Sequence, residues 1–500
     1  MRNIAFTFIL LFSINCYCQV GIGTTNPKAQ LDIKATNASN PANIDGVLVP
    51  RIDVFPTVNP TSDQNSMLVY LTTTNTIYKS GYYYWDNPST TWKNFESKDF
   101  NTFDQFSQRP TNLGAVDSGI KYLYTQTGNF HQWIWNAVTF SGKWIVLNQS
   151  EINVKDFGAI GDGIADDTVA IQNCLNQYNC IYFPKGIFGI SASIIIKDGV
   201  RSISGQARDA SVIKFLQNAT PSLLNINGEN TIPLFISQAA IEGFLFTGDK
   251  FVIRDLSFDC SGISSSSCLV IQNWDSIIEK CFFSKFTKFG LMLNKFNNNS
   301  NSQVNGKISQ CFFEGQTAIY GIYFKGSSTD WMIMYNHFSG SNYDVYIPDS
   351  AGLIFTNNHT YGIRSAYFGK FYNTVIANNY FETKVELHGI SNDSGILGTF
   401  GPGNTLFEDL NIYFDGGRSA ANGDEMFFST NNTYNLSAAL IHRFSDDSKI
   451  LFSQNDRFNA VDSFKKGSPI SETTYYPLTQ PGKIKILNSV VNGNPINQTY

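Results

Sequence analysis

A repeating unit between residues 253 and 381 limits the fold of this 500-residue chain more than any other feature. In each copy an isoleucine is followed three residues later by leucine, cysteine or asparagine, and five residues later by a ring-bearing residue. The copies are Ile253, Leu256 and Phe258; Ile278, Cys281 and Phe283; Ile308, Cys311 and Phe313; Ile333, Asn336 and Phe338; Ile354, Asn357 and His359; and Ile376, Asn379 and Phe381. The isoleucines are 25, 30, 25, 21 and 22 residues apart, and such a period indicates stacked supersecondary units.

Each unit is rich in β-branched and aromatic residues and lacks a long helical periodicity, which favours coils of parallel strands. Equivalent residues of neighbouring coils would then stack about 4.8 Å apart. The repeat therefore predicts an isoleucine ladder, a ladder of leucine, cysteine and asparagine, and an aromatic ladder in which His359 replaces a phenylalanine as a core residue. Asparagine and aromatic ladders stabilise stacked strands.

A further strand with an apolar-x-apolar pattern precedes the later copies, beginning at Leu269, Leu291, Ile322, Val345 and Tyr367. Because side chains alternate along a strand, the middle residue of each pattern is predicted to point outward. The predicted outward residues are Val270, Met292, Tyr323, Tyr346 and Phe368. An aromatic row on the surface has three interpretations: a platform for sugar rings, a surface buried under a loop, or a contact with another subunit.

Residues 152–189 hold a short strand, a glycine-rich turn, a helix and a second strand. The elements are Asp-Phe-Gly-Ala (156–159), Gly-Asp-Gly (161–163), Asp-Asp-Thr (166–168) and Pro-Lys-Gly (184–186). Asp166 and Asp167 directly precede an apolar helical run, which suits a helix N-cap. We therefore interpret these acids, together with Asp162, as capping and turn residues and not as catalytic residues.

This series resembles the opening of the pectate-lyase-superfamily (rhamnogalacturonase/epimerase-like) β-helix, which also starts the shaft of many phage tailspikes. The resemblance implies an all-β fold, a right-handed single-stranded parallel β-helix over residues 151–400 with an N-terminal capping helix. Residues 401–500 are expected to form its C-terminal end or cap. Analogy with tailspikes suggests a homotrimer. A fold of this kind does not by itself identify a reaction.

The N-terminal third predicts export and small β-rich modules. Residues 1–18 have the pattern of a secretory signal peptide cleaved after Cys18, with a lipid-anchored cysteine as the alternative. Their apolar run is too short for a permanent membrane anchor, and no later segment suits one. Residues 19–98, which resemble N-terminal segments of exported Bacteroidetes proteins, predict a stalk or attachment segment. Residues 99–150 predict a small adaptor like those before tailspike shafts. The protein is therefore expected to be secreted or at the cell surface.

The composition limits the classes of partner that the protein is expected to bind. Charged residues make up 15% of the chain and the net charge is −5, which argues against nucleic acid or an anionic membrane as the main partner. A polysaccharide is the expected partner, and no metal-ligand spacing or cofactor motif is present. Export permits disulfides. The predicted pairs are Cys174 with Cys180 and Cys260 with Cys268, whereas Cys281 and Cys311 are predicted to be free buried thiols.

The sequence leaves catalysis open. The polygalacturonase branch carries Asn-Thr-Asp, Asp-Asp, Gly-His-Gly and Arg-Ile-Lys, and this chain matches none of them well. The acids beside the aromatic strands are the catalytic candidates: Asp330, Asp344, Asp349, Glu382 and Glu386. The candidate substrate contacts are Tyr323, Tyr346, Phe368, His337 and Lys384. These residues suit a glycoside hydrolase or polysaccharide lyase with a surface groove, and the alternative is a non-catalytic adhesin or fibre-like binding protein.

Overall fold

The computed structural model divides the chain into two compact units, residues 1–101 and 102–500. It describes residues 19–499 except 76, 96–100, 243–249, 273–274, 294–302, 327, 351, 370–372, 391–395, 416–424, 436–437, 445–448, 460–463, 468–474, 477–483 and 492. The predicted signal peptide lies outside these residues. Among the described residues, no helix is long and apolar enough to cross a membrane.

The first unit consists of two small β sheets. Strands β1 (Val20–Ile22) and β2 (Leu31–Ile33) form a parallel pair. Strands β3 (Arg51–Ile52), β4 (Leu68–Leu71), β5 (Gly81–Asp86) and β6 (Thr91–Asn94) form a second sheet in that order, with the 3-10 turn η1 (Ser62–Gln64) before β4. The core of the second sheet consists of Val69, Leu71, Tyr83, Trp85 and Trp92.

The second unit begins with a four-stranded sheet. Its strands are β7 (Asn101–Phe103), β8 (Lys121–Tyr124), β9 (Asn129–Asn136) and β10 (Ser141–Val146), with 3-10 turns η2 (Phe106–Gln108) and η3 (Ala115–Asp117). The buried Asp156 of the next segment fastens this sheet, because its carboxylate accepts hydrogen bonds from Thr127 and Asn129 and pairs with His131. Asp156 thus has a structural role.

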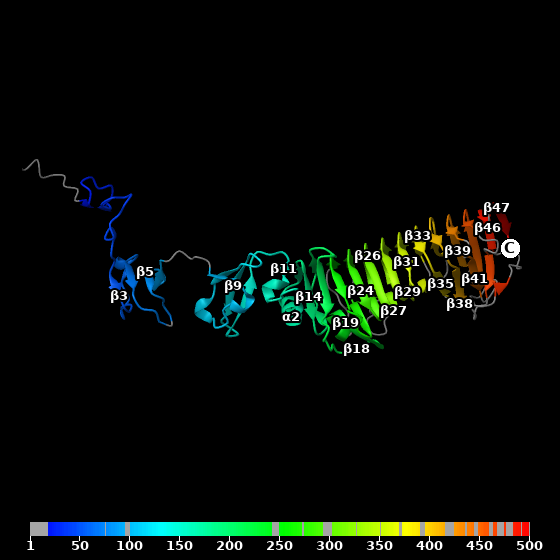
Figure 1. Cartoon of the computed structure of the whole chain (residues 1–500), viewed down its shortest axis with the longest axis horizontal. Helices are drawn as coiled ribbons and strands as arrows, with labels where there is room; N and C mark the ends of the chain where they lie inside the picture. The colour runs from blue at the N-terminus through cyan, green and yellow to red at the C-terminus, as the bar shows by residue number, and fades with distance from the viewer. Residues whose placement is uncertain are drawn as a thin grey trace, which may run out of the picture. The chain divides into compact units, whose positions relative to one another are not determined.

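Residues 152–499 form a parallel β-helix whose strands belong to one 37-stranded sheet. The coils follow one another from β11 to β47 (Figure 1). Each coil has three sides, and each side is a ladder of parallel strands.

The first side contains β11 (Ile152–Asn153), β13 (Cys180–Phe183), β16 (Ser202–Gly205), β20 (Phe251–Arg254), β23 (Ser276–Glu279), β26 (Gln303–Ser309), β28 (Ser328–Met334), β30 (Ile354–Thr356), β33 (Thr374–Ala377), β36 (Ile396–Phe400), β39 (Glu425–Thr430), β42 (Lys449–Gln454) and part of β46 (Ile484–Val491). The second side contains β12 (Asp162–Asp166), β14 (Gly186–Ile190), β17 (Ser211–Phe215), β21 (Ser257–Asp259), β24 (Phe282–Phe286), the starts of β27 (Phe312–Phe324) and β29 (His337–Ile347), then β31 (His359–Tyr361), β34 (Tyr380–Phe381), β37 (Thr405–Leu406), β40 (Thr433–Tyr434) and β43 (Arg457–Phe458). The third side contains β15 (Ile194–Ile196), β19 (Glu229–Ser237), β22 (Ser266–Ile271), β25 (Phe289–Leu293), the ends of β27 and β29, then β32 (Arg364–Phe368), β35 (Lys384–Ile390), β38 (Leu410–Asp415), β41 (Leu440–Phe444) and β44 (Phe464–Gly467). Strands β18 (Leu224–Ile226), β45 (Tyr475–Tyr476) and β47 (Asn494–Thr499) add antiparallel pairs, and α3 (Gln238–Glu242) follows β19.

The glycine-rich segment forms the turns that its sequence predicts. The 3-10 turn η4 (Val154–Phe157) ends at Gly158, whose φ is +97°. Helix α2 (Thr168–Gln177) follows, and its inward residues belong to the core of the β-helix. The Asp166 carboxylate accepts the Thr168 N–H at 3.0 Å, and that of Asp167 accepts the Ile160 N–H at 2.7 Å. These acids therefore organise the turn.

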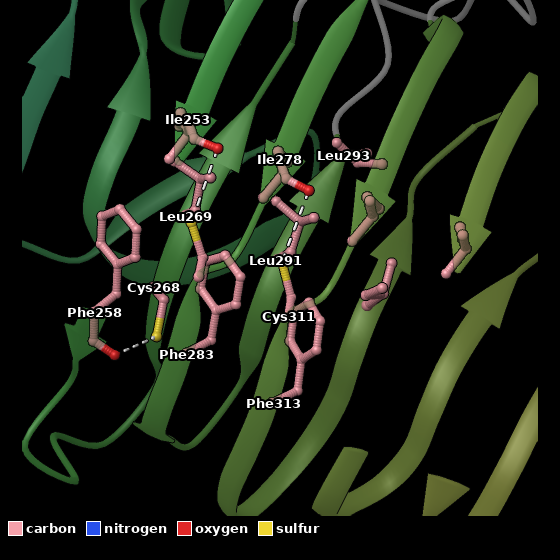
Figure 2. Close-up of a cluster of buried hydrophobic side chains, with 14 of the residues drawn as sticks. Ile253, Phe258, Cys268, Leu269, Ile278, Phe283, Leu291, Leu293, Cys311 and Phe313 are labelled. Atoms are coloured by element: carbon pink, nitrogen blue, oxygen red, sulfur yellow. Dashed lines mark hydrogen bonds between the residues drawn. The ribbon is translucent and has the colours of Figure 1, made fainter. Parts of the chain in front are cut away.

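Inside the coils, the predicted ladders are present from the first to the fourth copy of the repeat. Ile253 is in register with Ile278, which is in register with Ile308. Phe283 and Phe313 stack with ring centroids 4.7 Å apart, and cysteine thiols lie between the rings and the isoleucines (Figure 2). The interior is therefore a column of like side chains.

The fifth copy of the repeat is shifted by one residue from the prediction. Phe355, and not Ile354, is in register with Ile376, and Asn358 replaces Asn357 in the ladder. Since side chains alternate, the shift also turns His359 outward, where it is in register with His337 and Tyr380. The prediction that His359 is a core residue is therefore wrong.

The six cysteines of the described chain are free. The predicted disulfide between Cys174 and Cys180 is absent. Cys260 and Cys268 are both buried, but their sulfurs are 3.4 Å apart, whereas a disulfide requires about 2.05 Å. Cys281 and Cys311 are buried free thiols, as predicted.

Candidate functional site

A groove runs along the corner at which the chain passes from the second to the third side. We call it the corner groove. Its volume is about 600 Å³, and four successive coils contribute to it through β27, β29, the β31–β32 turn and the β34–β35 turn. It is lined by Thr317, Ala318, Ser339, Gly340, Ser341, Asn342, Tyr361, Gly362, Ile363, Glu382 and Thr383.

Two glycines, Gly340 and Gly362, are among the residues that line the groove. A Cβ atom on Gly340 would lie 2.1 Å from the Gly315 carbonyl oxygen, and one on Gly362 would lie 2.4 Å from the Asp344 carboxylate. Neither position can hold a larger residue without a shift of its neighbours. At the rim, the side chains of Tyr361 and Ile363 are 59% and 69% exposed, which is unusual for large apolar groups.

Glu382 brings a charge to this groove. Its Oε1 lies 3.1 Å from Nε2 of His359, and both side chains are partly exposed. The His337 ring is 4.9 Å from the His359 ring, and partial burial together with the neighbouring His359 lowers the pKa of His337. A carboxylate paired with an imidazole at an open groove is suited to proton transfer.

Asp344 lies beneath the groove and not in it. The residue is 0% exposed, its Oδ2 accepts the Gly362 N–H at 2.6 Å, and its Oδ1 has no hydrogen-bond partner among the described residues. Burial raises the pKa of Asp344 to about 8. The burial of Asp344 beneath the Gly362 backbone does not support its predicted catalytic role.

The other predicted acids are separated from each other. Glu386 is buried on β35, where its Oε1 lies 3.1 Å from Nη1 of Arg364 and its Oε2 lies 3.7 Å from Nε2 of His388. Asp330 is exposed on β28, and Asp349 is half-buried just after β29. Neither of these two aspartates lines the corner groove.

Two cations lie where the groove meets the third side. Arg364 follows Ile363 and Lys384 follows Thr383, and the two are in register on β32 and β35. The guanidinium of Arg364 also bonds to the Tyr343 hydroxyl. Lys384 is half-buried. Lys384 thus lies two residues after Glu382, which pairs with His359.

The predicted aromatic row forms a self-stacked column, which we call the tyrosine stack: Tyr320, Tyr323, Tyr343, Tyr346 and Tyr367. The rings of Tyr346 and Tyr367 are 4.4 Å apart and 13° from parallel. The Tyr323 ring stacks on Phe289 at 5.0 Å, and its hydroxyl lies 3.4 Å from Glu229. Because the Tyr320–Tyr323 and Tyr346–Tyr367 rings stack on one another, these four rings each have one face covered, which does not support the sugar-platform interpretation.

The covered-surface interpretation is correct for the first coils of this row. Val270, Met292 and Tyr323 form a buried cluster with Ile226 of β18 and Ala240 of α3. Burial and the Glu229 charge raise the pKa of Tyr323 well above its usual value.

Phe368 is not an outward residue. It is 0% exposed and in register with Ile347 and Leu387, both of which point into the core. The outward residue of β32 is Tyr367, which is in register with Tyr346. The predicted role of Phe368 in substrate binding is therefore wrong.

Tyr361 and Ile363 at the rim were not among the predicted site residues. The signal that could have found them is Gly362 between two large apolar residues, a pattern that suits a turn with both neighbours exposed. This pattern was missed because the register of β30, the preceding strand, was predicted one residue out.

Comparisons with known proteins agree with this fold. Residues 151–368 match the family model "Rhamnogalacturonase A/epimerase, pectate lyase-like", and residues 21–108 match "Phage tail like trimerisation region". The chain is 32% identical over 108 residues to Mannuronan C5-epimerase AlgE1 of Azotobacter vinelandii, which covers 19% of this chain and 8% of the epimerase. It is 36% identical over 72 residues to the Pre-neck appendage protein of Bacillus phage B103, covering 14% and 8%.

Among solved structures, the tailspike protein of Acinetobacter baumannii phage AM24 covers 86% of this chain and 63% of its own, with 12% identity and a TM-score of 0.43. The chain spans less than a tenth of the length of the epimerase and the appendage protein. Residues 151–368 form a domain of the Rhamnogalacturonase A/epimerase, pectate lyase-like family.

Proposed function

We propose that this protein binds and cleaves a polysaccharide in the corner groove, and that it does so as a lyase acting on uronate units. The observation that carries the proposal is that Glu382, which lines an open groove together with the exposed Tyr361, pairs with His359 just outside the lining. Tyr361 offers a ring that makes no stacking contact within the described part of the chain, and such a ring can pack on a sugar face.

A lyase fits these residues better than a hydrolase. Hydrolysis of a glycosidic bond needs two carboxylates about 5 to 10 Å apart. Among the described lining residues, Glu382 is the one carboxylate, and a base and a cation lie next to the lining, as His359 paired with Glu382 and as Lys384 directly after Thr383. A lyase instead needs a base next to the acidic C5–H of a uronate and a cation near its carboxylate.

The roles follow from the positions. His359 would take the C5 proton while Glu382 orients its imidazole and stabilises the charge that forms. The bond from C4 to the glycosidic oxygen then breaks, the departing oxygen takes the proton from the His359 imidazolium, and a C4–C5 double bond remains in the new end. Lys384, beside Thr383, would neutralise the uronate carboxylate.

The test is a cleavage assay on residues 19–500 with alginate, polygalacturonate and bacterial surface polysaccharides. New reducing ends that appear together with the ultraviolet absorbance of the double bond are expected, and His359→Ala should lower kcat by at least 100-fold. Glu382→Gln should shift the pH profile and lower kcat less. Asp330→Asn is the matched control because this exposed carboxylate lies away from the groove. Reducing ends without absorbance would refute the lyase chemistry.

A non-catalytic binding protein is the second candidate, and one observation favours it. The match of residues 21–108 to a phage tail like trimerisation region supports a fibre-like homotrimer. In that case no polymer would be cleaved, and Tyr361→Ala would abolish retention on a polysaccharide gel. Measuring cleavage and retention on the same protein separates the two functions.

A further inference from the structure

A second hollow lies at a different corner, where the chain passes from the first to the second side. Its volume is about 500 Å³. It is lined by Arg208, Asp209, Asp255, Lys280, Gln310, Phe312 and Tyr335. We call it the first-corner hollow, and none of these residues belongs to the corner groove.

From Asp255 onward, each coil places one residue with a positive φ at this corner, directly before the inward ladder. From the fifth copy of the repeat onward these residues suit that backbone: Asn357, Asn378, Gly403, Asn431, Asn455 and Asn488. Asparagine and glycine adopt the left-handed region at the lowest cost. The sequence thus supplies residues suited to a positive φ at the later corners.

Three of the four corner residues that line the hollow break this pattern, whereas the fourth, Asp255, is of a type that tolerates its φ of +58°. Lys280 has a φ of +53°, Gln310 of +57° and Tyr335 of +57°. Tyr335 is the one aromatic residue among the described corner residues, and a bulky side chain is rare at positive φ. A residue kept in an unfavourable conformation next to a hollow indicates a binding role.

The side chains around Tyr335 suit a sugar. Tyr335 is 58% exposed, and its ring makes no stacking contact within the described residues, so one face is open. Arg208 lies over Phe312 with its guanidinium carbon 4.3 Å from the ring centroid, which fixes a donor at the hollow. Asp209 and Asp255 add carboxylates that can accept hydrogen bonds from hydroxyl groups.

The charges of the lining select the class of ligand. Arg208 and Lys280 are cationic and Asp209 and Asp255 are anionic, so the hollow has a balanced formal charge. A polyanion would gain little from this balance, whereas a neutral pyranose can use an aromatic face together with polar groups of both signs. We propose that the first-corner hollow binds a neutral pyranose unit of a polysaccharide, with the sugar ring packed on Tyr335. This site goes beyond the proposed lyase activity and does not depend on it.

The test is affinity electrophoresis of residues 19–500 through gels that contain dextran, xylan or galactomannan, with an alginate gel for comparison. Retention is expected on at least one neutral gel and should change less than twofold between low and physiological salt. Tyr335→Asn should weaken this retention about tenfold and at the same time raise the melting temperature, because asparagine suits the backbone at this corner. Tyr335→Phe keeps the ring and should retain the protein.

Two results would overturn the proposal. One is wild-type protein that runs unretarded through all three neutral gels. The other is Tyr335→Asn protein that is retained like the wild type. A melting temperature that rises or stays equal in Tyr335→Asn shows that any loss of retention is not a loss of fold. Because His359→Ala leaves the hollow intact, it should abolish cleavage without altering this retention, so the two proposals fail separately.

Discussion

Replacing Asp344 with asparagine should change how stability depends on pH. The pKa of Asp344 is about 8 in the folded protein and about 3.8 when the residue is exposed, because burial disfavours its charged form. Between these values the folded state binds a proton that the unfolded state has released. The contribution of Asp344 to the free energy of unfolding is therefore fully present below pH 3.8. It falls as the pH rises toward 8, by about 1.4 kcal/mol per pH unit.

The Asp344→Asn protein lacks this titration. Its free energy of unfolding, minus that of the wild type, should therefore grow by about 2 to 3 kcal/mol between pH 5 and pH 7. Urea unfolding of both proteins at the two pH values measures this difference, and other titrating groups cancel in it. Asp330→Asn is the matched control, because this exposed aspartate has a φ of +61°, which asparagine also tolerates. A difference that is the same at both pH values would refute the burial argument.

Two further substitutions test the interior register. Asn358→Ala removes the acceptor of the Asn336 N–H, 3.0 Å away, and the donor to the Ile333 carbonyl, 2.9 Å away. With each unpaired buried group costing about 1 to 3 kcal/mol, urea unfolding should show a loss of about 2 to 5 kcal/mol. Asn357→Gly should change stability by less than about 0.5 kcal/mol, since glycine suits its φ of +56°; the reverse order would contradict the register. Phe368→Ala should cost about 3 to 5 kcal/mol in the same assay without altering retention on polysaccharide gels, because this ring fills the core.

The sequence predicted the coils because inward residues obey a strict spacing. At each corner one residue has a positive φ, and the residue after it points into the ladder. The residues three and five positions after Ile278, Ile308 and Ile333 therefore point inward in every copy. At the fifth copy two adjacent residues are apolar, Ile354 and Phe355, and two adjacent residues are asparagines. The sequence pattern fits both registers there. The structure selects one of them because the Asn358 side chain bonds to both neighbouring rungs of the ladder.

The site was harder to predict because contacts between distant segments determine its exposure. Tyr323 is outward by alternation but buried, since the β18–β19 hairpin and α3 cover this part of the third side. Asp344 is on the strand that the sequence identified, yet Gly362 of the next coil seals it. The sequence pattern around Tyr323 or Asp344 does not show that another segment covers it. Glu382 was identified correctly as an acid near a turn, but its partner His359 was assigned to the core.

Outward register alone does not make an aromatic residue a sugar-binding residue in a β-helix. Coils about 4.8 Å apart bring equivalent rings to the distance at which they stack on one another, and Tyr346 and Tyr367 do so at 4.4 Å. When an aromatic residue is repeated from coil to coil, the rings of neighbouring coils therefore cover each other's faces. An aromatic residue that occurs once at a corner keeps its face open, as Tyr335 and Tyr361 do at 58% and 59% exposure. Ligand-binding rings in this protein should therefore be sought where the repeat is broken, and both proposed sites lie at such positions.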